Sequence, residues 1–157
     1  MSLCEIILPQ LILPQAACKS KNDLIHTLVE KIYEAGIELP INQHSLIKTI
    51  HIREDIGGTL LPSGLSIPHA RLKDYEGFVI AFGIPTKAIP QNGMQLRMMT
   101  LMISSSTGGP HYLKSLAALT KISRDKVYFE KLCSVKSTEE FLEVLKESEL
   151  KSLSSEL

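Results

Sequence analysis

The chain has 157 residues, of which 44% are hydrophobic and 22% are charged, and its 17 basic side chains balance its 17 acidic ones. This length allows one domain, over residues 1–157, with a full hydrophobic core. The neutral balance excludes the strongly basic footprint of a typical nucleic-acid-binding domain, and no polybasic run suggests binding to a membrane surface.

The cysteines and the apolar runs indicate in which cellular compartment we expect the protein. Three cysteines (Cys4, Cys18 and Cys133) make an odd number without a C-x-x-C spacing, so neither a disulfide framework nor a zinc site is indicated. Free thiols fit a reducing cytoplasm. No apolar run has the length of a transmembrane helix, and the N-terminus lacks the form of a signal peptide. We therefore expect a cytoplasmic protein that does not insert into a membrane.

The first part of the chain predicts an extended segment followed by two helices. Leu3–Leu13 is apolar and contains a proline, which is tolerated at the edge of a sheet. Ser20 is predicted to cap a helix that ends at Gly36, and Asn42 to begin a second helix that ends at Gly57. Apolar residues recur at helical spacing in both segments.

The middle of the chain predicts buried strands. Leu65–Pro68 is a short strand candidate, and Gly77–Ile84 is a nearly continuous apolar run typical of a central strand buried on both faces. Pro85–Gly93 is predicted to be a loop. Leu96–Ser104 is the second buried-strand candidate.

Helices are predicted to fill the rest of the chain. After a loop over Ser104–Pro110, helical patterns cover His111–Ile122 and Asp125–Leu132, and a capping box at Ser137–Glu140 opens a last helix. Strands interleaved with helices indicate an α/β fold, with a mixed β-sheet flanked by helices on both faces.

The stretch Arg53–Arg71 carries the chemistry. It ends a short apolar segment on Pro68 and His69. Neutral imidazole is available as a nucleophile near neutral pH, and the preceding proline restricts the backbone that presents it. Thr59 and Ser66 are candidate donors to phosphate oxygens. Arg53 or Arg71 could neutralise a phosphoryl charge with its planar fork of donors.

A second histidine supports the same chemistry. His111 follows Gly108, Gly109 and Pro110 at the start of a predicted helix, where backbone amides favour anions. It could hold phosphoryl oxygens or orient His69.

Plainer interpretations exist for each of these residues. A histidine after proline is more often a turn residue than a nucleophile, and His111 alone could be a cap or a surface residue. A zinc site of His51, His69 and His111 is a weaker hypothesis, because three histidines can bind zinc but the sequence fixes no geometry. The nucleotide-binding loop G-x-x-x-x-G-K-[ST] and the hydrolase elbow G-x-S-x-G are both absent.

Taken together, these motifs resemble a known family. The resemblance rests on Arg53-Glu54, Gly58-Thr59, the run from Gly64 to His69, the opening of the first helix from Ser20, and the helix that begins at Pro110-His111. The chain resembles the IIA domain of the bacterial phosphoenolpyruvate-dependent sugar phosphotransferase system, fructose/mannitol type, including its nitrogen-regulatory branch. Ala70 departs from the glycine that usually follows the motif histidine.

The resemblance implies a function and its residues. His69 would accept a phosphoryl group from the phosphohistidine carrier protein and pass it to a IIB partner in sugar uptake. Arg53 would stabilise the charge, and His111 would be a second histidine at the site. The family uses no metal or organic cofactor for this step. A regulatory module, in which phosphorylation switches binding to a target protein and no sugar is phosphorylated, is the alternative.

Overall fold

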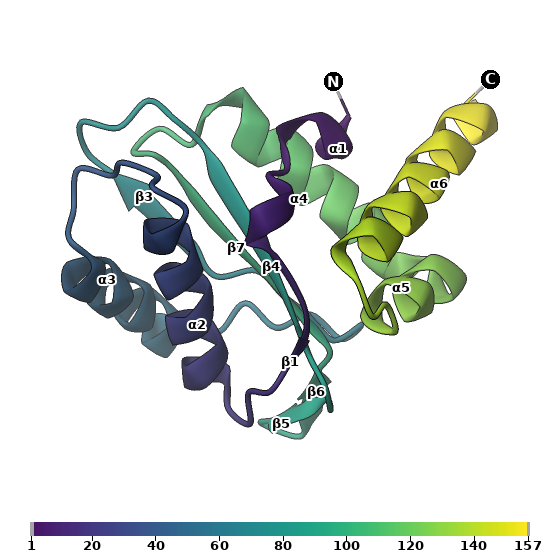
Figure 1. Ribbon diagram of the computed structural model, residues 1–157, viewed down its shortest axis with the longest axis horizontal. Coiled ribbons are helices and arrows are strands. Elements are labelled where there is room, and N and C mark those ends of the chain that lie inside the picture. The colour runs from purple at the N-terminus through teal and green to yellow at the C-terminus, as the bar shows by residue number, and fades with distance from the viewer. Residues whose placement is uncertain (1, 157) are drawn as a thin grey trace.

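The computed structural model of the chain describes residues 2–156 (Figure 1), so the two end residues of the expected domain lie outside it. Helices and strands alternate along the described part. In chain order they are α1 (Leu3–Ile6), a 3-10 helix (Pro9–Leu11), β1 (Ile12–Ala16), α2 (Lys21–Glu34), α3 (Gln43–Ile56), β2 (Leu65–Ser66), β3 (His69–Leu72), β4 (Val79–Pro85), β5 (Ile89–Gln91), β6 (Met94–Leu96), β7 (Met98–Ser105), α4 (Gly109–Arg124), α5 (Lys126–Cys133) and α6 (Thr138–Glu156). No helix in residues 2–156 is long and apolar enough to cross a membrane.

The central sheet is mixed, as predicted. Its order is β1-β4-β7-β2, and β3 also pairs with β7 beyond the end of β2. Strands β4 and β7 are antiparallel, whereas β1 runs parallel to β4 and both β2 and β3 run parallel to β7. A separate two-stranded hairpin joins β5 and β6.

Helices cover both faces of this sheet (Figure 1), which confirms the predicted α/β architecture. Side chains alternate between the two faces of a strand. On β4, Ala81 enters the core under α2 and α3, and Phe82 enters the core under α4, α5 and α6. On β7, Leu101 enters the core under α2 and α3, and Met102 enters the core under α4, α5 and α6.

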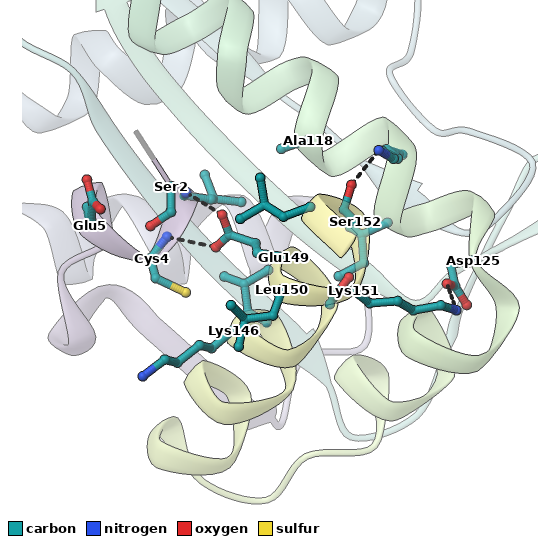
Figure 2. Close-up of a pocket in the computed structure, with 16 residues that line it drawn as sticks. Ser2, Cys4, Glu5, Ala118, Asp125, Lys146, Glu149, Leu150, Lys151 and Ser152 are labelled. Atoms are coloured by element: carbon teal, nitrogen blue, oxygen red, sulfur yellow. Dashed lines mark hydrogen bonds and ion pairs between the residues drawn. The ribbon is translucent and has the colours of Figure 1, made fainter. Parts of the chain in front are cut away.

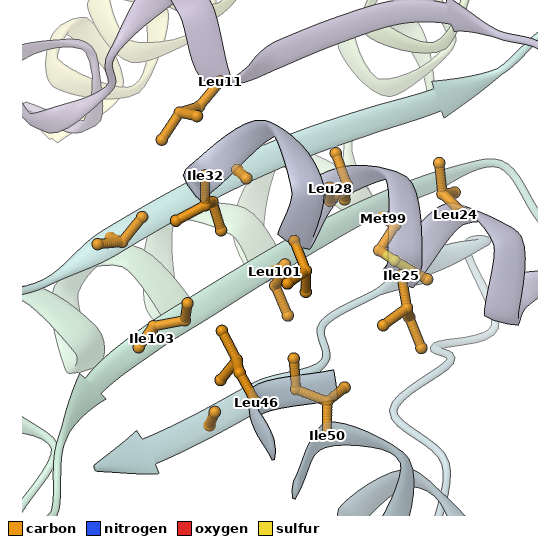
Figure 3. Close-up of a cluster of buried hydrophobic side chains, with 14 of the residues drawn as sticks. Leu11, Leu24, Ile25, Leu28, Ile32, Leu46, Ile50, Met99, Leu101 and Ile103 are labelled. Atoms are coloured by element: carbon orange, nitrogen blue, oxygen red, sulfur yellow. The ribbon is translucent and has the colours of Figure 1, made fainter. Parts of the chain in front are cut away.

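The α2 side of the sheet is closely packed (Figure 3). Leu24 and Leu28 of α2 are fully buried above the central strands. Gly83 of β4 makes this approach possible, because a Cβ there would lie 2.8 Å from Leu24 Cδ1. The first predicted helix is thus held by apolar contacts, and Ser20 caps it by accepting a hydrogen bond from the Asp23 amide at 3.1 Å.

The prediction for Leu3–Leu13 was wrong in part. Only its last two residues belong to β1, which does lie at the sheet edge, and the earlier residues form α1 and the 3-10 helix. The cause is a long-range contact: Glu149 of α6 accepts hydrogen bonds from the amides of Leu3 and Cys4 at 2.9 and 3.1 Å. A carboxylate at these unpaired amides stabilises a helical turn that local sequence does not favour.

The predicted loop Pro85–Gly93 was also wrong in part, because β5 lies within it. Asn92 and Gly93 turn the chain into β6 with φ angles of 50° and 81°. This Asn-Gly pair is the strongest short signal for a hairpin. The sequence did not predict β3 (His69–Leu72) or β6 (Met94–Leu96); both are short strands that form through pairing with β7 and β5. The other helices and strands lie close to their predicted bounds.

We expect the α2 contacts to dominate stability on this face of the sheet. Leu28→Ala should lower the free energy of unfolding by about 2–5 kcal/mol, because it leaves a cavity against β4. Urea unfolding followed by circular dichroism measures this. Leu113→Ala, at a side chain 65% exposed on α4, is the control and should change stability by less than about 0.5 kcal/mol. Equal losses in the free energy of unfolding of both variants would contradict this description of the packing.

Candidate functional site

His69 is the first residue of β3, at the edge of the sheet. It pairs with Met102 of β7, and the Pro68 carbonyl before it accepts a hydrogen bond from the Met102 amide at 3.0 Å. Proline is tolerated here because the strand lies at an edge. Gly64, with φ of 101°, brings the preceding segment against β7. A Cβ at this glycine would lie 2.9 Å from the backbone oxygen of Gln95, so only glycine fits.

Strand alternation decides which way His69 faces. Ala70 and Leu72 of β3 enter the core under α2 and α3. His69 and Arg71 therefore face the opposite side, where α4 begins. The Arg71 guanidinium carbon lies 5.5 Å from the centre of the Tyr112 ring, in the first turn of α4.

Two side chains fix the imidazole. The His69 ring stacks on Tyr112 with ring centroids 4.1 Å apart and planes inclined by 13°. Its Nε2 atom lies 2.8 Å from the Oγ atom of Ser104, a fully buried residue near the end of β7. Ser104 Oγ also donates to the Ser105 carbonyl oxygen at 3.1 Å. One contact sets the ring plane and the other its rotation, so His69 is held in one orientation.

Ser104 and Tyr112 do not stand out in the sequence as site residues. The sequence predicts Ser104 at the end of a strand, and only the pairing of β3 with β7 brings it to His69. Tyr112 directly follows the predicted site residue His111. A signal for it existed, because an aromatic residue in the first turn of the helix next to the motif is a candidate ring partner.

The surroundings of His69 favour its neutral form. Burial, together with the positive charges of Arg71 and Arg53, lowers the pKa of His69 from 6.5 to about 4, and burial is the largest of these causes. Desolvation and like charge both disfavour a cationic imidazole. One of its two ring nitrogens thus stays unprotonated throughout the neutral range.

A pocket of about 580 Å³ opens at this histidine. It brings together four residues that the sequence singled out as site candidates: Arg53 of α3, Thr59, His69 and Arg71. Tyr112 also lines it. The pocket therefore combines one neutral imidazole, two guanidinium groups and hydroxyl groups, which is a suitable set for a phosphoryl group.

Ser66 takes a different place. It is fully buried and lines a neighbouring pocket of about 440 Å³. Its Oγ atom lies 3.3 Å from that of Thr59, which donates to Glu54 Oε1 at 3.0 Å and accepts from the Ile67 amide at 3.2 Å. These bonds hold the segment that leads to His69.

His111 also lies apart from the residues that line the His69 pocket. Its side chain is exposed, and its ring lies against Phe78 with centroids 6.0 Å apart. The position stacked on His69 is taken by its neighbour Tyr112.

The hypothesis of a three-histidine zinc site finds no support in this geometry. His51 Nε2 lies 3.2 Å from His26 Nε2, and within residues 2–156 no three His, Cys, Asp or Glu side chains are grouped to hold a metal ion.

A larger hollow of about 780 Å³ lies elsewhere, between α1, α4 and α6 (Figure 2). Glu149 projects into it and binds the amides of α1, and Lys151 pairs with Asp125 at 3.1 Å. Two of its acidic side chains, Glu149 and Asp125, are engaged in holding these helices together. We therefore place the candidate site at His69.

Comparison with known proteins shows the family of the chain and its fold. The family model described as phosphoenolpyruvate-dependent sugar phosphotransferase system, EIIA 2, matches residues 5–148. A nitrogen regulatory protein of Bradyrhizobium diazoefficiens is 24% identical over 148 residues, covering 92% of this chain and 95% of the relative.

Solved structures share the fold, and two of them are the following. The nitrogen regulatory protein IIA-Ntr of Neisseria meningitidis has a TM-score of 0.72 at 22% identity, covering 91% of this chain and 98% of that one. The complex of enzyme IIA-mannitol with phosphorylated enzyme IIB-mannitol of Escherichia coli has a TM-score of 0.70 at 17% identity, covering 88% and 95%.

The pKa of His69 can be tested directly. We expect its ring signals to titrate near pH 4 in two-dimensional NMR, because the buried ring resists protonation. Arg71→Ala removes a repelling charge, so the pKa should rise while staying below 6.5. His69→Gln identifies the signals by their loss. A midpoint near 6.5 in the unsubstituted protein would contradict the described environment.

Proposed function

We propose that this chain is a phosphocarrier with His69 as its phosphorylated residue. The chain belongs to the EIIA 2 family of the phosphoenolpyruvate-dependent sugar phosphotransferase system. The observation that carries this proposal is the fixed, neutral imidazole of His69 in a pocket with Arg53 and Arg71. The family match covers residues 5–148 and so includes the whole of this site.

The transfer needs few parts. An unprotonated nitrogen of His69 donates its lone pair to the phosphorus of a phosphohistidine on the carrier protein, and the carrier's N–P bond breaks. When the phosphohistidine of the carrier bears a proton on its other ring nitrogen, as neutral His69 does, the leaving group is a neutral imidazole that takes back its electron pair, and no proton has to move during the exchange. Such a reaction depends mainly on positioning and on stabilising charge.

The two arginines disfavour protonated His69 and favour phosphorylated His69. Arg71 and Arg53 lower the pKa of His69 because they repel a proton on the ring. The same charges attract a phosphoryl dianion bound to that ring. Positive charge in the pocket therefore favours phosphohistidine over protonated histidine. The start of α4, next to Tyr112, adds partial positive charge from its free amides.

Exposed apolar side chains on the helices that reach the pocket support a protein partner. Ile52 and Ile56 of α3 are 54% and 77% exposed, and Leu113 of α4 is 65% exposed. These helices also carry Arg53 and Tyr112, which line the pocket. Exposed apolar side chains around charged groups are typical of sites where proteins meet. We propose that the phosphohistidine carrier protein docks here, and then a IIB partner, in the cytoplasm. The related IIA-mannitol was solved with phosphorylated IIB-mannitol.

A regulatory role is the second candidate. It is favoured by the likeness to two nitrogen regulatory proteins, from Bradyrhizobium diazoefficiens and Neisseria meningitidis. In this role the phosphoryl group on His69 changes which target protein binds, and no sugar is phosphorylated. A pull-down that compares phosphorylated and unmodified protein separates the roles: a target retained by one form alone supports regulation, and discharge to a IIB protein supports transport.

His69→Ala should abolish phosphorylation. Incubation with phosphoenolpyruvate, the first enzyme of the relay and its carrier protein should give an acid-labile phosphate on the unsubstituted chain and none on this variant, because the nucleophile is gone. His111→Ala is the matched control and should keep its label, with a milder effect on rate. Equal labelling of the unsubstituted protein and His69→Ala would refute the assignment.

Arg53→Ala should slow transfer more than it affects stability. The side chain is exposed, so the free energy of unfolding should change by less than about 0.5 kcal/mol. The single-turnover rate should fall roughly tenfold or more, because one of two cations near the phosphoryl group is lost. Rapid-quench transfer from the labelled carrier measures it, with Arg124→Ala, at the end of α4, as control. An unchanged rate would show that Arg53 has no part in transfer.

A further inference from the structure

Two histidines outside the His69 pocket face one another across neighbouring helices. His26 lies on α2 and His51 on α3, and their Nε2 atoms are 3.2 Å apart. The ring centroids are separated by 5.3 Å with planes inclined by 40°. His26 is exposed and His51 partly exposed, so ions in solvent can reach both rings. The proposed phosphoryl transfer uses neither of them.

The spacing matches that of two ligands of one metal ion. Zinc binds imidazole nitrogen at about 2.0–2.1 Å, so two nitrogens on a tetrahedral ion lie about 3.3 Å apart. The observed separation of 3.2 Å is within about 0.1 Å of this value. Without metal, the N–H of one ring donates to the nitrogen of the other. A metal ion takes the place of that proton when both rings carry their hydrogen on Nδ1.

The helices hold both residues in place before any ion binds. Ile25 and Ile50, the residues next to the two histidines, are fully buried in the same core. Each helix is capped at its start, by Ser20 in α2 and by Asn42 in α3. A binding site on rigid elements keeps more of the intrinsic affinity of its ligands than one on loops.

The surroundings decide which ion fits. Burial lowers the pKa of His51, and the neighbouring His26 acts in the same direction. Asp55 and Glu54 act on His51 with negative charge, and Lys21 acts with positive charge. Residues 2–156 hold no group of three ligating side chains, so water completes the coordination. Two imidazoles with open positions suit zinc, nickel and copper, whereas magnesium and calcium require oxygen ligands.

We propose that His26 and His51 form a two-histidine site for a divalent transition-metal ion of the zinc, nickel and copper class. The ion joins α2 to α3, the helix that also carries Arg53. The site is separate from the His69 pocket and does not depend on the proposed phosphoryl transfer.

Zinc titration of the full chain against a chromophoric chelator tests the proposal. The unsubstituted protein should take up one ion per chain. His26→Gln and His51→Gln should each weaken zinc binding by at least about tenfold. Loss of a residue that only hydrogen-bonds to a metal ligand already costs about tenfold or more, and loss of one of two ligands should cost at least as much. His44→Gln, at an exposed histidine on the same helix α3, is the matched control and should bind like the unsubstituted protein.

Further variants make the outcome decisive. Cys18→Ser and His69→Gln should keep full affinity, and a loss in either would overturn the two-imidazole assignment. Thermal unfolding shows that the variants fold without metal, and excess zinc should raise the midpoint of the unsubstituted protein and not that of His26→Gln. Equal affinity in all variants, or no binding by the unsubstituted protein, would overturn the proposal.

Discussion

The site depends on one contact between the sheet and a helix. The imidazole of His69, at the edge of the sheet, stacks on Tyr112 of α4 and bonds to Ser104 of β7. The three residues come from separate strands and a helix, so the ring is aligned only when the sheet has formed and α4 has packed on it. Gly64 and the partly buried Thr59–Glu54 hydrogen bond direct the chain into that edge strand. Much of the architecture around the sheet edge thus serves to hold one ring.

This arrangement links packing to electrostatics. A ring that is stacked and half-buried loses water, and desolvation is the largest cause of the lowered pKa of His69. Arg71 and Arg53 add to the effect and at the same time give the pocket a charge suited to a phosphoryl group. Contacts that fix the geometry therefore also keep the nitrogen unprotonated. The lowered pKa of His69 reduces the stability of the fold at acidic pH. As the pH falls from about 6.5 to about 4, the histidine becomes protonated in the unfolded chain but not in the folded one, which favours unfolding.

Much of the fold follows from local sequence patterns, whereas the contacts that complete the site around His69 do not. The caps at Ser20 and Asn42 and the apolar runs of β4 and β7 are local signals, and they predicted helices and strands near their observed bounds. The motif predicted His69, Arg53 and Thr59, which line one pocket. Ser104 and Tyr112 reach His69 through strand pairing and helix packing, which span long stretches of chain. The helical turn α1 depends on Glu149 in the same way.

The central claim is that His69 is a neutral nucleophile at a pH where ordinary histidines are protonated. The direct test is the rate at which phosphoramidate, a small phosphoryl donor, phosphorylates the protein, relative to a short histidine peptide, between about pH 7.5 and 5. Mass spectrometry of the intact protein follows the product, and His69→Gln gives the background. The account predicts that the ratio of the two rates rises as the pH falls, because the peptide becomes protonated and His69 does not. A constant ratio, or labelling that persists in His69→Gln, would contradict it.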